Sequence, residues 1–146
     1  GGERIGDTVK FLTQNKINVM GHLGMLPQSL RGPAEVYGKN KQERIQIFRD
    51  ISILEEAGVF SVVIECTLKS IVDELINTTN LPLIGIGASS SCVGQIIVTE
   101  DILGMTEFNS RFSKRYFQFS SEARKAIKKF TLDVKNKKYP NKKQCY

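Results

Sequence analysis

The sequence predicts an α/β fold with a parallel sheet, and its length supplies only part of a closed barrel. Short apolar strands alternate with amphipathic helices, and this order is typical of right-handed βαβ units. The strand candidates lack clean polar alternation, which indicates burial on both faces. An eight-stranded α/β barrel takes about 250 residues, whereas the chain has 146. We therefore expect one domain, or part of one, over 1–146, with 136–146 as a flexible basic tail.

The first predicted elements are a helix, a short strand and a long loop. Apolar spacing predicts a helix over 7–15 and a strand over 17–20. Breakers then predict a loop, at Pro27, Gly32, Pro33 and Gly38. A loop of this length inside a compact domain is more often functional than decorative.

A helix and a buried strand follow the loop. Asn40 is a suitable cap for a helix over 41–57, and Gly58 supplies its C-terminal stop. The next strand is predicted over 60–66, where β-branched residues run together without alternation.

The remainder repeats this order with weaker signals. Thr67 is the predicted cap of a helix over 68–77, and a further strand is predicted over 81–87. Residues 95–98 fit either a strand or the first turns of a helix. Two last helices are predicted, weakly over 108–117 and more strongly over 121–135.

The net charge of +6 arises mainly in the C-terminal segment, where ten basic residues lie between Arg111 and Lys138. Aromatic residues do not alternate with these cations on a recognisable platform, which disfavours a nucleic-acid partner. No apolar run approaches the roughly 18 residues of a membrane span. The three cysteines show no C-x-x-C spacing, as expected of a reducing compartment. We expect a cytoplasmic protein with no nucleic-acid or membrane partner.

Ligands of parallel α/β folds bind at the carboxyl ends of strands, because loops converge there. Glu65 ends the buried strand over 60–66 and is the sharpest candidate. A carboxylate in that position must be paired, bound to a metal or held as a general base. The structural alternative is a glutamate turned toward a basic neighbour or toward water.

Two other strand ends hold candidates. His22, the single histidine of the sequence, stands between glycines that let a ligand approach closely. Its alternative is a histidine hydrogen-bonded at the base of a loop. Gly85 and Gly87 match only part of a phosphate-binding fingerprint, so we interpret them as backbone clearance for a ligand.

These strand ends resemble successive blocks of the ketopantoate hydroxymethyltransferase family in order and spacing. The resemblance covers nearly the whole chain but only the second half of the family's barrel. It implies an α/β fold that is the C-terminal half of a TIM (β/α)8 barrel of the phosphoenolpyruvate/pyruvate type. The blocks that carry it are Gly21-His22-Leu23-Gly24-Met25-Leu26-Pro27-Gln28-Ser29, Ile64-Glu65-Cys66, Ile84-Gly85-Ile86-Gly87-Ala88, Gly94-Gln95-Ile96-Ile97-Val98 and Asp101-Ile102-Leu103-Gly104.

The resemblance implies transfer of a hydroxymethyl group from 5,10-methylenetetrahydrofolate to 3-methyl-2-oxobutanoate, giving ketopantoate for pantothenate and coenzyme A synthesis. Glu65 matches the family's catalytic base, while His22, Gly85 and Gly87 match positions near the substrate. Mg²⁺ holds the keto acid in the family, and its ligands belong to the first half of the barrel. No metal ligand is therefore assigned in this chain. The family also implies a homo-oligomer, a decamer among its members.

Three residues depart from the family pattern near the strand ends. Leu26, Ser89 and Val93 stand where threonine, glycine and an acidic residue are common. Two alternatives therefore stay open. One is a degenerate, non-catalytic barrel fragment that acts only in an oligomer, and the other is a different 2-keto acid carbon–carbon bond enzyme of the same superfamily.

Overall fold

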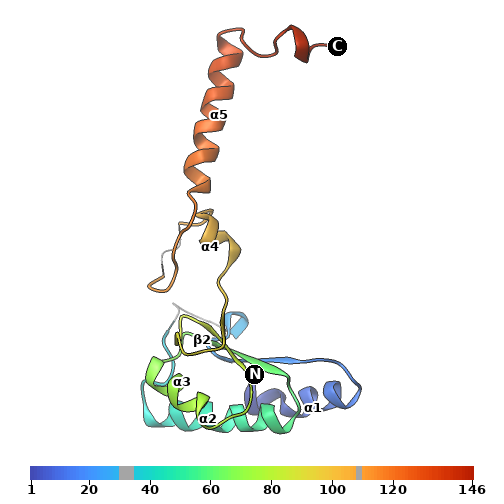
Figure 1. Ribbon diagram of the computed structural model, residues 1–146, viewed down its shortest axis with the longest axis vertical. Helices are drawn as coiled ribbons and strands as arrows, with labels where there is room; N and C mark the ends of the chain where they lie inside the picture. The colour runs from blue at the N-terminus through green and yellow to red at the C-terminus, as the bar shows by residue number, and fades with distance from the viewer. Residues whose placement is uncertain (30–34, 108–109) are drawn as a thin grey trace. The chain divides into compact units, whose positions relative to one another are not determined.

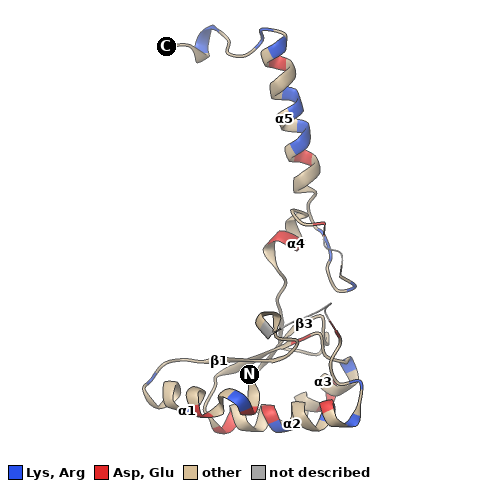
Figure 2. Cartoon of the chain, turned by 180° about the vertical axis from the view of Figure 1, so that it is seen from behind, with Lys and Arg blue, Asp and Glu red and all other residues tan. Residues whose placement is uncertain are grey.

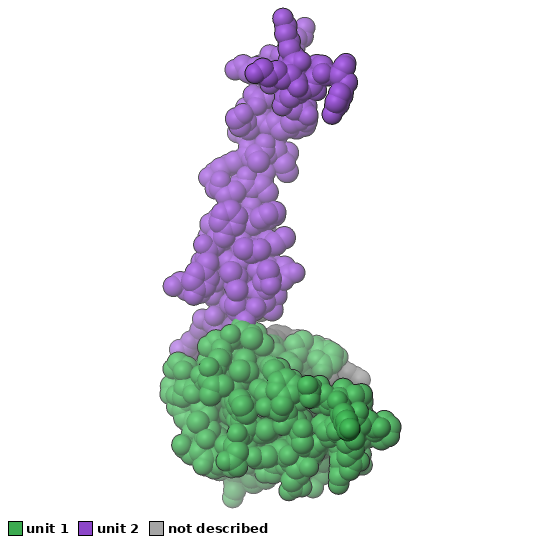
Figure 3. Space-filling model, turned by 45° about the vertical axis from the view of Figure 1, so that its right-hand side comes forward, with its two compact units in different colours: residues 1–96 green, residues 97–146 purple. Residues whose placement is uncertain are grey.

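The computed structural model describes residues 1–29, 35–107 and 110–146. The chain divides into two compact units, Gly1–Ile96 and Ile97–Tyr146, which Figure 3 shows in separate colours. The first unit is a parallel sheet with helices packed on one of its faces (Figure 1). The predicted α/β class is thus confirmed, whereas one domain over 1–146 and a flexible tail over 136–146 stay predictions.

Four parallel strands form the sheet in the order β1-β2-β3-β4. Every residue of β2 is buried, as the unalternating run of β-branched residues predicts. Gly24 pairs with Glu65, and Glu65 pairs with Ile86, so three strands end at one level of the sheet. The strands are β1 (Met20–Gly24), β2 (Ser61–Glu65), β3 (Leu83–Ile86) and β4 (Gly94–Gln95).

Three helices pack on one face of this sheet: α1 (Gly6–Gln14), α2 (Lys41–Glu56) and α3 (Lys69–Ile76). The predicted cap of α2 is confirmed, because the Asn40 side chain accepts a hydrogen bond from the Glu43 N–H at 2.9 Å. Alternate residues of the strands meet the apolar stripes of the helices and form the core. Its fully buried members include Leu54, Val62, Ile64, Val72 and Leu75.

The predicted strand over 17–20 was wrong in position, because β1 begins at Met20 and ends at Gly24. Gly21 and Gly24 lower the strand propensity of this segment, so the sequence pattern did not indicate a strand there. Packing explains one of them: a Cβ on Gly21 would lie 2.8 Å from the Leu54 side chain of α2. Close contact between sheet and helix therefore requires glycine there.

Thr67 does not cap α3, which was also a wrong prediction. The helix begins at Lys69 after Leu68, without a side-chain cap. The Thr67 hydroxyl instead donates to the carbonyl of Glu65 at 3.1 Å. This residue is 2% exposed, and its hydroxyl serves the strand end rather than the helix.

The second unit contains α4 (Thr99–Leu103) and α5 (Phe119–Lys135), and Figure 2 shows basic residues along α5. The undecided segment 95–98 contributes one residue to β4 and then stays non-helical until α4. The helix predicted over 108–117 was wrong for the described residues 110–117. Part of this segment instead lies against α4, because the N–H groups of Tyr116 and Phe117 both donate hydrogen bonds to the Ile102 carbonyl.

Two 3-10 turns precede α2, at Gly2–Ile5 and Pro27–Ser29, and a third lies at Lys142–Gln144. Part of the predicted loop, residues 30–34, falls outside the described residues. Within the described part of the chain, no helix has the length and apolar character needed to cross a membrane.

Candidate functional site

Glu65 is the last residue of β2, and the fold places its carboxylate in a buried position. Successive side chains of a strand point to opposite faces. Val62 and Ile64 belong to the helix-covered core, so Glu65 lies on the other face of the sheet with Val63. Glu65 is only 7% exposed. A buried carboxylate requires a partner, because loss of its hydration is costly.

His22 is that partner. Its Nε2 lies 3.0 Å from Glu65 Oε2, and an ionised carboxylate accepts the Nε2–H. His22 pairs with Val63 in the parallel register, which puts it on the face of Glu65 and one step before it. The His22 side chain is 34% exposed, so the pair has a buried acid and a solvent-reachable imidazole. The structure thus brings together two of the four predicted site residues.

Backbone contacts hold the Glu65 end of β2 from several sides. The Glu65 carbonyl accepts from the Met25 N–H at 2.9 Å as well as from Thr67. Cys66 follows with φ of +46°, a left-handed conformation that costs a non-glycine residue free energy. Its carbonyl accepts from the Tyr37 N–H at 2.7 Å, and burial raises the pKa of its thiol. These hydrogen bonds and the strained residue Cys66 fix the backbone that carries the carboxylate.

Gly85 and Gly87 belong to β3 and to the turn directly after it. Gly85 is in register with Ile64, so its missing side chain belongs to the helix-facing side of the sheet. A Cβ there would lie 2.9 Å from the Gln95 amide oxygen and 3.2 Å from Cys92 Sγ. Gly87 follows β3 with φ of +59°. Packing therefore explains Gly85, and a turn at the strand end explains Gly87.

Ser89 has a structural role that the sequence did not reveal. Its hydroxyl donates to the carboxylate of Asp73 on α3 and accepts from the Ser91 N–H at 3.1 Å. Lys69 pairs with the same carboxylate, and hydrogen bonds from Lys69 and Ser89 lower the pKa of Asp73. Ser89 is 3% exposed and anchors the loop after β3 to α3. No local sequence pattern indicates this role, because Ser89 and Asp73 lie sixteen residues apart in the chain.

The other two departures from the expected family pattern lie at the surface or beside it. Val93 is 75% exposed. Leu26 is half-buried and lines a hollow of about 450 Å³ together with Gly24 and Tyr37. Leu26 therefore lies near the strand ends, whereas Val93 lies at the surface.

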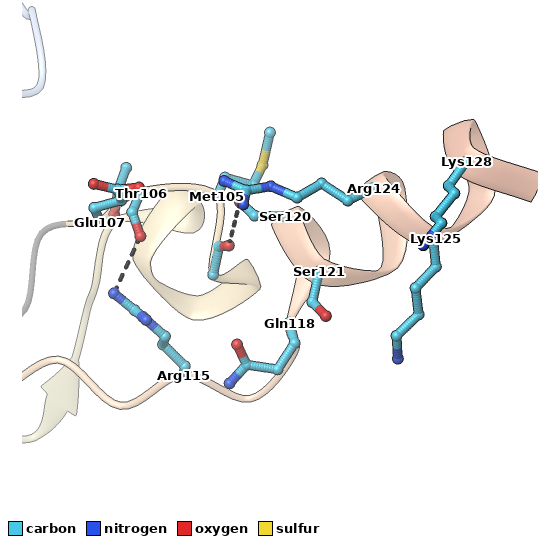
Figure 4. A pocket seen from close by; sticks show the side chains of 11 residues that line it. Met105, Thr106, Glu107, Arg115, Gln118, Ser120, Ser121, Arg124, Lys125 and Lys128 are labelled. Atoms are coloured by element: carbon cyan, nitrogen blue, oxygen red, sulfur yellow. Dashed lines mark hydrogen bonds between the residues drawn. The ribbon is translucent and has the colours of Figure 1, made fainter. Parts of the chain in front are cut away.

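A second hollow, of about 580 Å³, lies within the second unit between the segment after α4 and the start of α5 (Figure 4). The Arg115 guanidinium donates to the Thr106 carbonyl at 3.1 Å on its wall. Glu107 is the acidic residue of the lining, which has a net positive charge. None of the predicted site residues lines it. The cationic residues are Arg115, Arg124, Lys125 and Lys128.

The described residues do not fit a magnesium centre. Among 1–29, 35–107 and 110–146, no group of three or more histidine, cysteine, aspartate or glutamate side chains is placed to hold a metal. Glu65 and His22 form a pair, and Mg²⁺ prefers several oxygen ligands. What the pair offers is a carboxylate that can accept a proton, with an imidazole to orient it.

The sequence is similar to a known enzyme family and to curated proteins that carry the corresponding name. The model of the ketopantoate hydroxymethyltransferase family matches residues 1–142. The chain is 45% identical over 146 residues to the 3-methyl-2-oxobutanoate hydroxymethyltransferase of Pelagibacter ubique, covering 100% of this chain and 56% of the relative. The same-named protein of Sulfolobus acidocaldarius is 42% identical over 142 residues, covering 96% of this chain and 53% of the relative. That of Saccharolobus islandicus (strain L.S.2.15) is 44% identical over 144 residues, covering 97% and 54%.

The chain thus spans about half the length of the curated relatives it matches. Its parallel sheet, and the family model that matches almost all of its residues, agree with the α/β fold and the resemblance seen in the sequence. The chain therefore belongs to the ketopantoate hydroxymethyltransferase family.

Proposed function

We propose that this chain supplies the catalytic base of a 3-methyl-2-oxobutanoate hydroxymethyltransferase. The observation that carries the proposal is the buried Glu65 carboxylate, 3.0 Å from His22 at the end of a parallel strand. Strand ends are where α/β folds build their active sites. The names of the relatives supply the keto acid and the transferred group.

The proposed reaction moves a one-carbon unit from 5,10-methylenetetrahydrofolate to 3-methyl-2-oxobutanoate and yields ketopantoate. Glu65 removes the proton from C3, the carbon next to the carbonyl, and the electron pair of that C–H bond becomes the enolate. The enolate carbon then forms a C–C bond to the methylene carbon of the folate, while the two C–N bonds that hold this carbon break. A water molecule supplies the hydroxyl group of ketopantoate, and its remaining proton and the proton taken up by Glu65 go to the two released nitrogens of tetrahydrofolate. Burial keeps water away from the carboxylate, and the rigid strand end holds it in position.

His22 keeps the carboxylate oriented through its Nε2–H and faces the keto acid with its exposed edge. Gly87, directly after β3, is proposed as a place where the backbone approaches the substrate, and Gly85, packed against Gln95 and Cys92 on the helix side, is proposed to position that strand end. Because the described residues do not fit a magnesium centre, no step of this scheme runs through a metal ion. Magnesium ligands elsewhere in the protein, assembly into a homo-oligomer and a place in the cytoplasm stay predictions.

The test uses a completed protein, in which this chain is joined behind the portion of the Pelagibacter ubique relative that it does not match. Exchange of the C3 proton of 3-methyl-2-oxobutanoate in D₂O, followed by ¹H NMR, isolates proton removal from folate chemistry. We expect Glu65→Gln to slow exchange by about 100-fold or more, the usual contribution of a positioned base.

Glu56→Gln is the matched control, since Glu56 is exposed at the end of α2. It removes the same charge outside the site and is expected to leave exchange unchanged. Circular dichroism and gel filtration establish that each variant is folded. Near-parental exchange in folded Glu65→Gln would show that another group is the base.

A further inference from the structure

Gly24, the last residue of β1, lies against the backbone of Glu65 rather than beside open space. Its φ is +81°, and a Cβ built on it would lie 2.1 Å from the Glu65 carbonyl oxygen. The same Cβ would lie 2.4 Å from Thr67 Oγ1. Real Cβ atoms do not approach other heavy atoms this closely, and here the nearest atom belongs to the backbone.

The Glu65 carbonyl cannot move away without breaking other contacts that hold it in place. It accepts hydrogen bonds from the Met25 N–H and from the hydroxyl of Thr67, which is 2% exposed. The next residue, Cys66, is already strained at φ of +46°. Added bulk at position 24 must therefore move the end of β1 away from the end of β2.

That movement acts directly on the candidate site. His22 stands two residues before Gly24 on β1, and Glu65 is the register partner of Gly24 on β2. The distance between Nε2 and Oε2 across these two strands is 3.0 Å. The Cβ at 2.1 Å is about 1.3 Å closer than the 3.4 Å of an ordinary contact, and a displacement of the strand ends by about that amount would lengthen the His22–Glu65 contact beyond hydrogen-bond range.

We infer that Gly24 is a positioning residue, which sets the separation of His22 and Glu65 by allowing the ends of β1 and β2 to touch. For its effect on catalysis the inference rests on the proposed function, but its geometric part does not. A glycine is needed here for two separable reasons, the left-handed backbone and the missing Cβ.

The chain contains a control that separates these reasons. Gly58, after α2, has φ of +83°, yet a Cβ on it would lie 3.5 Å from Thr13 Oγ1, an ordinary contact. Gly58→Ala therefore imposes the same backbone strain without the collision. Gly24→Ala imposes both.

The first measurement needs no activity. His22 is the single histidine of the chain, so ¹⁵N-labelled imidazole gives one set of signals. In the parent chain and in Gly58→Ala we expect an Nε2–H signal protected from solvent exchange by its hydrogen bond to Glu65. In Gly24→Ala we expect this protection to be lost. A retained, protected signal in folded Gly24→Ala would overturn the inference.

The second measurement is C3 proton exchange in the completed protein. We expect Gly24→Ala to lower kcat by about 100-fold with KM little changed, the effect of a reacting group misplaced by about 1 Å. Gly58→Ala is expected to retain kcat. Equal effects of the two substitutions on kcat would reduce Gly24 to a structural glycine and would refute the positioning role.

A second variant keeps the test decisive if Gly24→Ala does not fold. Gly24→Ala combined with Thr67→Ala removes one of the two colliding atoms, and the same two measurements apply to it, with Thr67→Ala alone as reference. If the double variant shows the same Nε2–H protection and the same kcat as Thr67→Ala alone, the inference is again overturned. The proposal that Glu65 is the base has its own test, and unchanged C3 proton exchange in Glu65→Gln would refute it. That result would not affect the imidazole measurement, which tests the geometric role of Gly24.

Discussion

The contact between His22 and Glu65 makes a quantitative prediction about stability. Replacing either residue with leucine leaves the other without its partner, whereas replacing both removes the unpaired groups together. We therefore expect the double variant His22→Leu/Glu65→Leu to be less destabilised than the sum of the two single variants. The difference is the coupling free energy of the pair.

Its magnitude follows from the burial of the two side chains. A hydrogen bond to a charged group contributes about 1.5–3 kcal/mol. The Glu65 side chain is 9% exposed, but that of His22 is 34% exposed, so water competes for one side of the contact. We expect a coupling free energy of about 1–2 kcal/mol at pH 7, below the full value for a charged hydrogen bond.

Urea unfolding followed by circular dichroism measures all four proteins of this cycle. The ion pair between Glu3 and Arg49 provides a parallel cycle, because its side chains are 47% and 60% exposed at a separation of 2.6 Å. That exposed pair is expected to couple by at most about 1 kcal/mol, and typically by less. A His22–Glu65 coupling no larger than that of Glu3 and Arg49 would refute the reasoning from burial.

Two further predictions concern the loop after β3 and the start of α2. Ser89→Ala removes a hydrogen bond to Asp73, so the pKa of Asp73 should rise toward its ordinary 3.8. Because this pKa is lowered in the fold, first by Lys69 and then by Ser89, its stabilising effect is present above pH 3.8 and is lost as the pH falls through the folded value. Carbon-13 titration of Asp73 checks this, and an unchanged pKa in Ser89→Ala contradicts it. Asn40→Ala should lower the free energy of unfolding by about 1 kcal/mol while Asn40→Ser loses little, since serine keeps the acceptor for the Glu43 N–H. Equal losses in the two urea titrations would show that capping is not the cause.

Local signals predicted the elements whose cause is local. The strand β2 is a β-branched run, and every one of its residues is buried. The start of α2 depends on a side chain and a backbone N–H three residues apart, so Asn40 identified it. Glu65 became a candidate for the same reason, because a carboxylate at the end of an apolar run is visible in the sequence itself, and its role as base stays a proposal.

Elements that depend on distant contacts were not predictable in this way. The position of β1 was missed because glycines weaken the strand signal, and the need for Gly21 comes from Leu54 of another helix. Thr67 looked like a helix cap, yet its hydroxyl bonds the Glu65 carbonyl behind it. The bond between Ser89 and Asp73 joins a loop to a helix, and no periodicity encodes such a pair.

The hydrogen bonds of Met25 and Tyr37 to the end of β2 have a consequence for how this part of the protein tolerates change. The two N–H groups donate to consecutive carbonyls, those of Glu65 and Cys66, and so two points of the chain are fixed to the end of β2 that carries Glu65. The Glu65 backbone is thus held by donors from two separate points of the chain, and the loss of either donor alone leaves the other hydrogen bond in place.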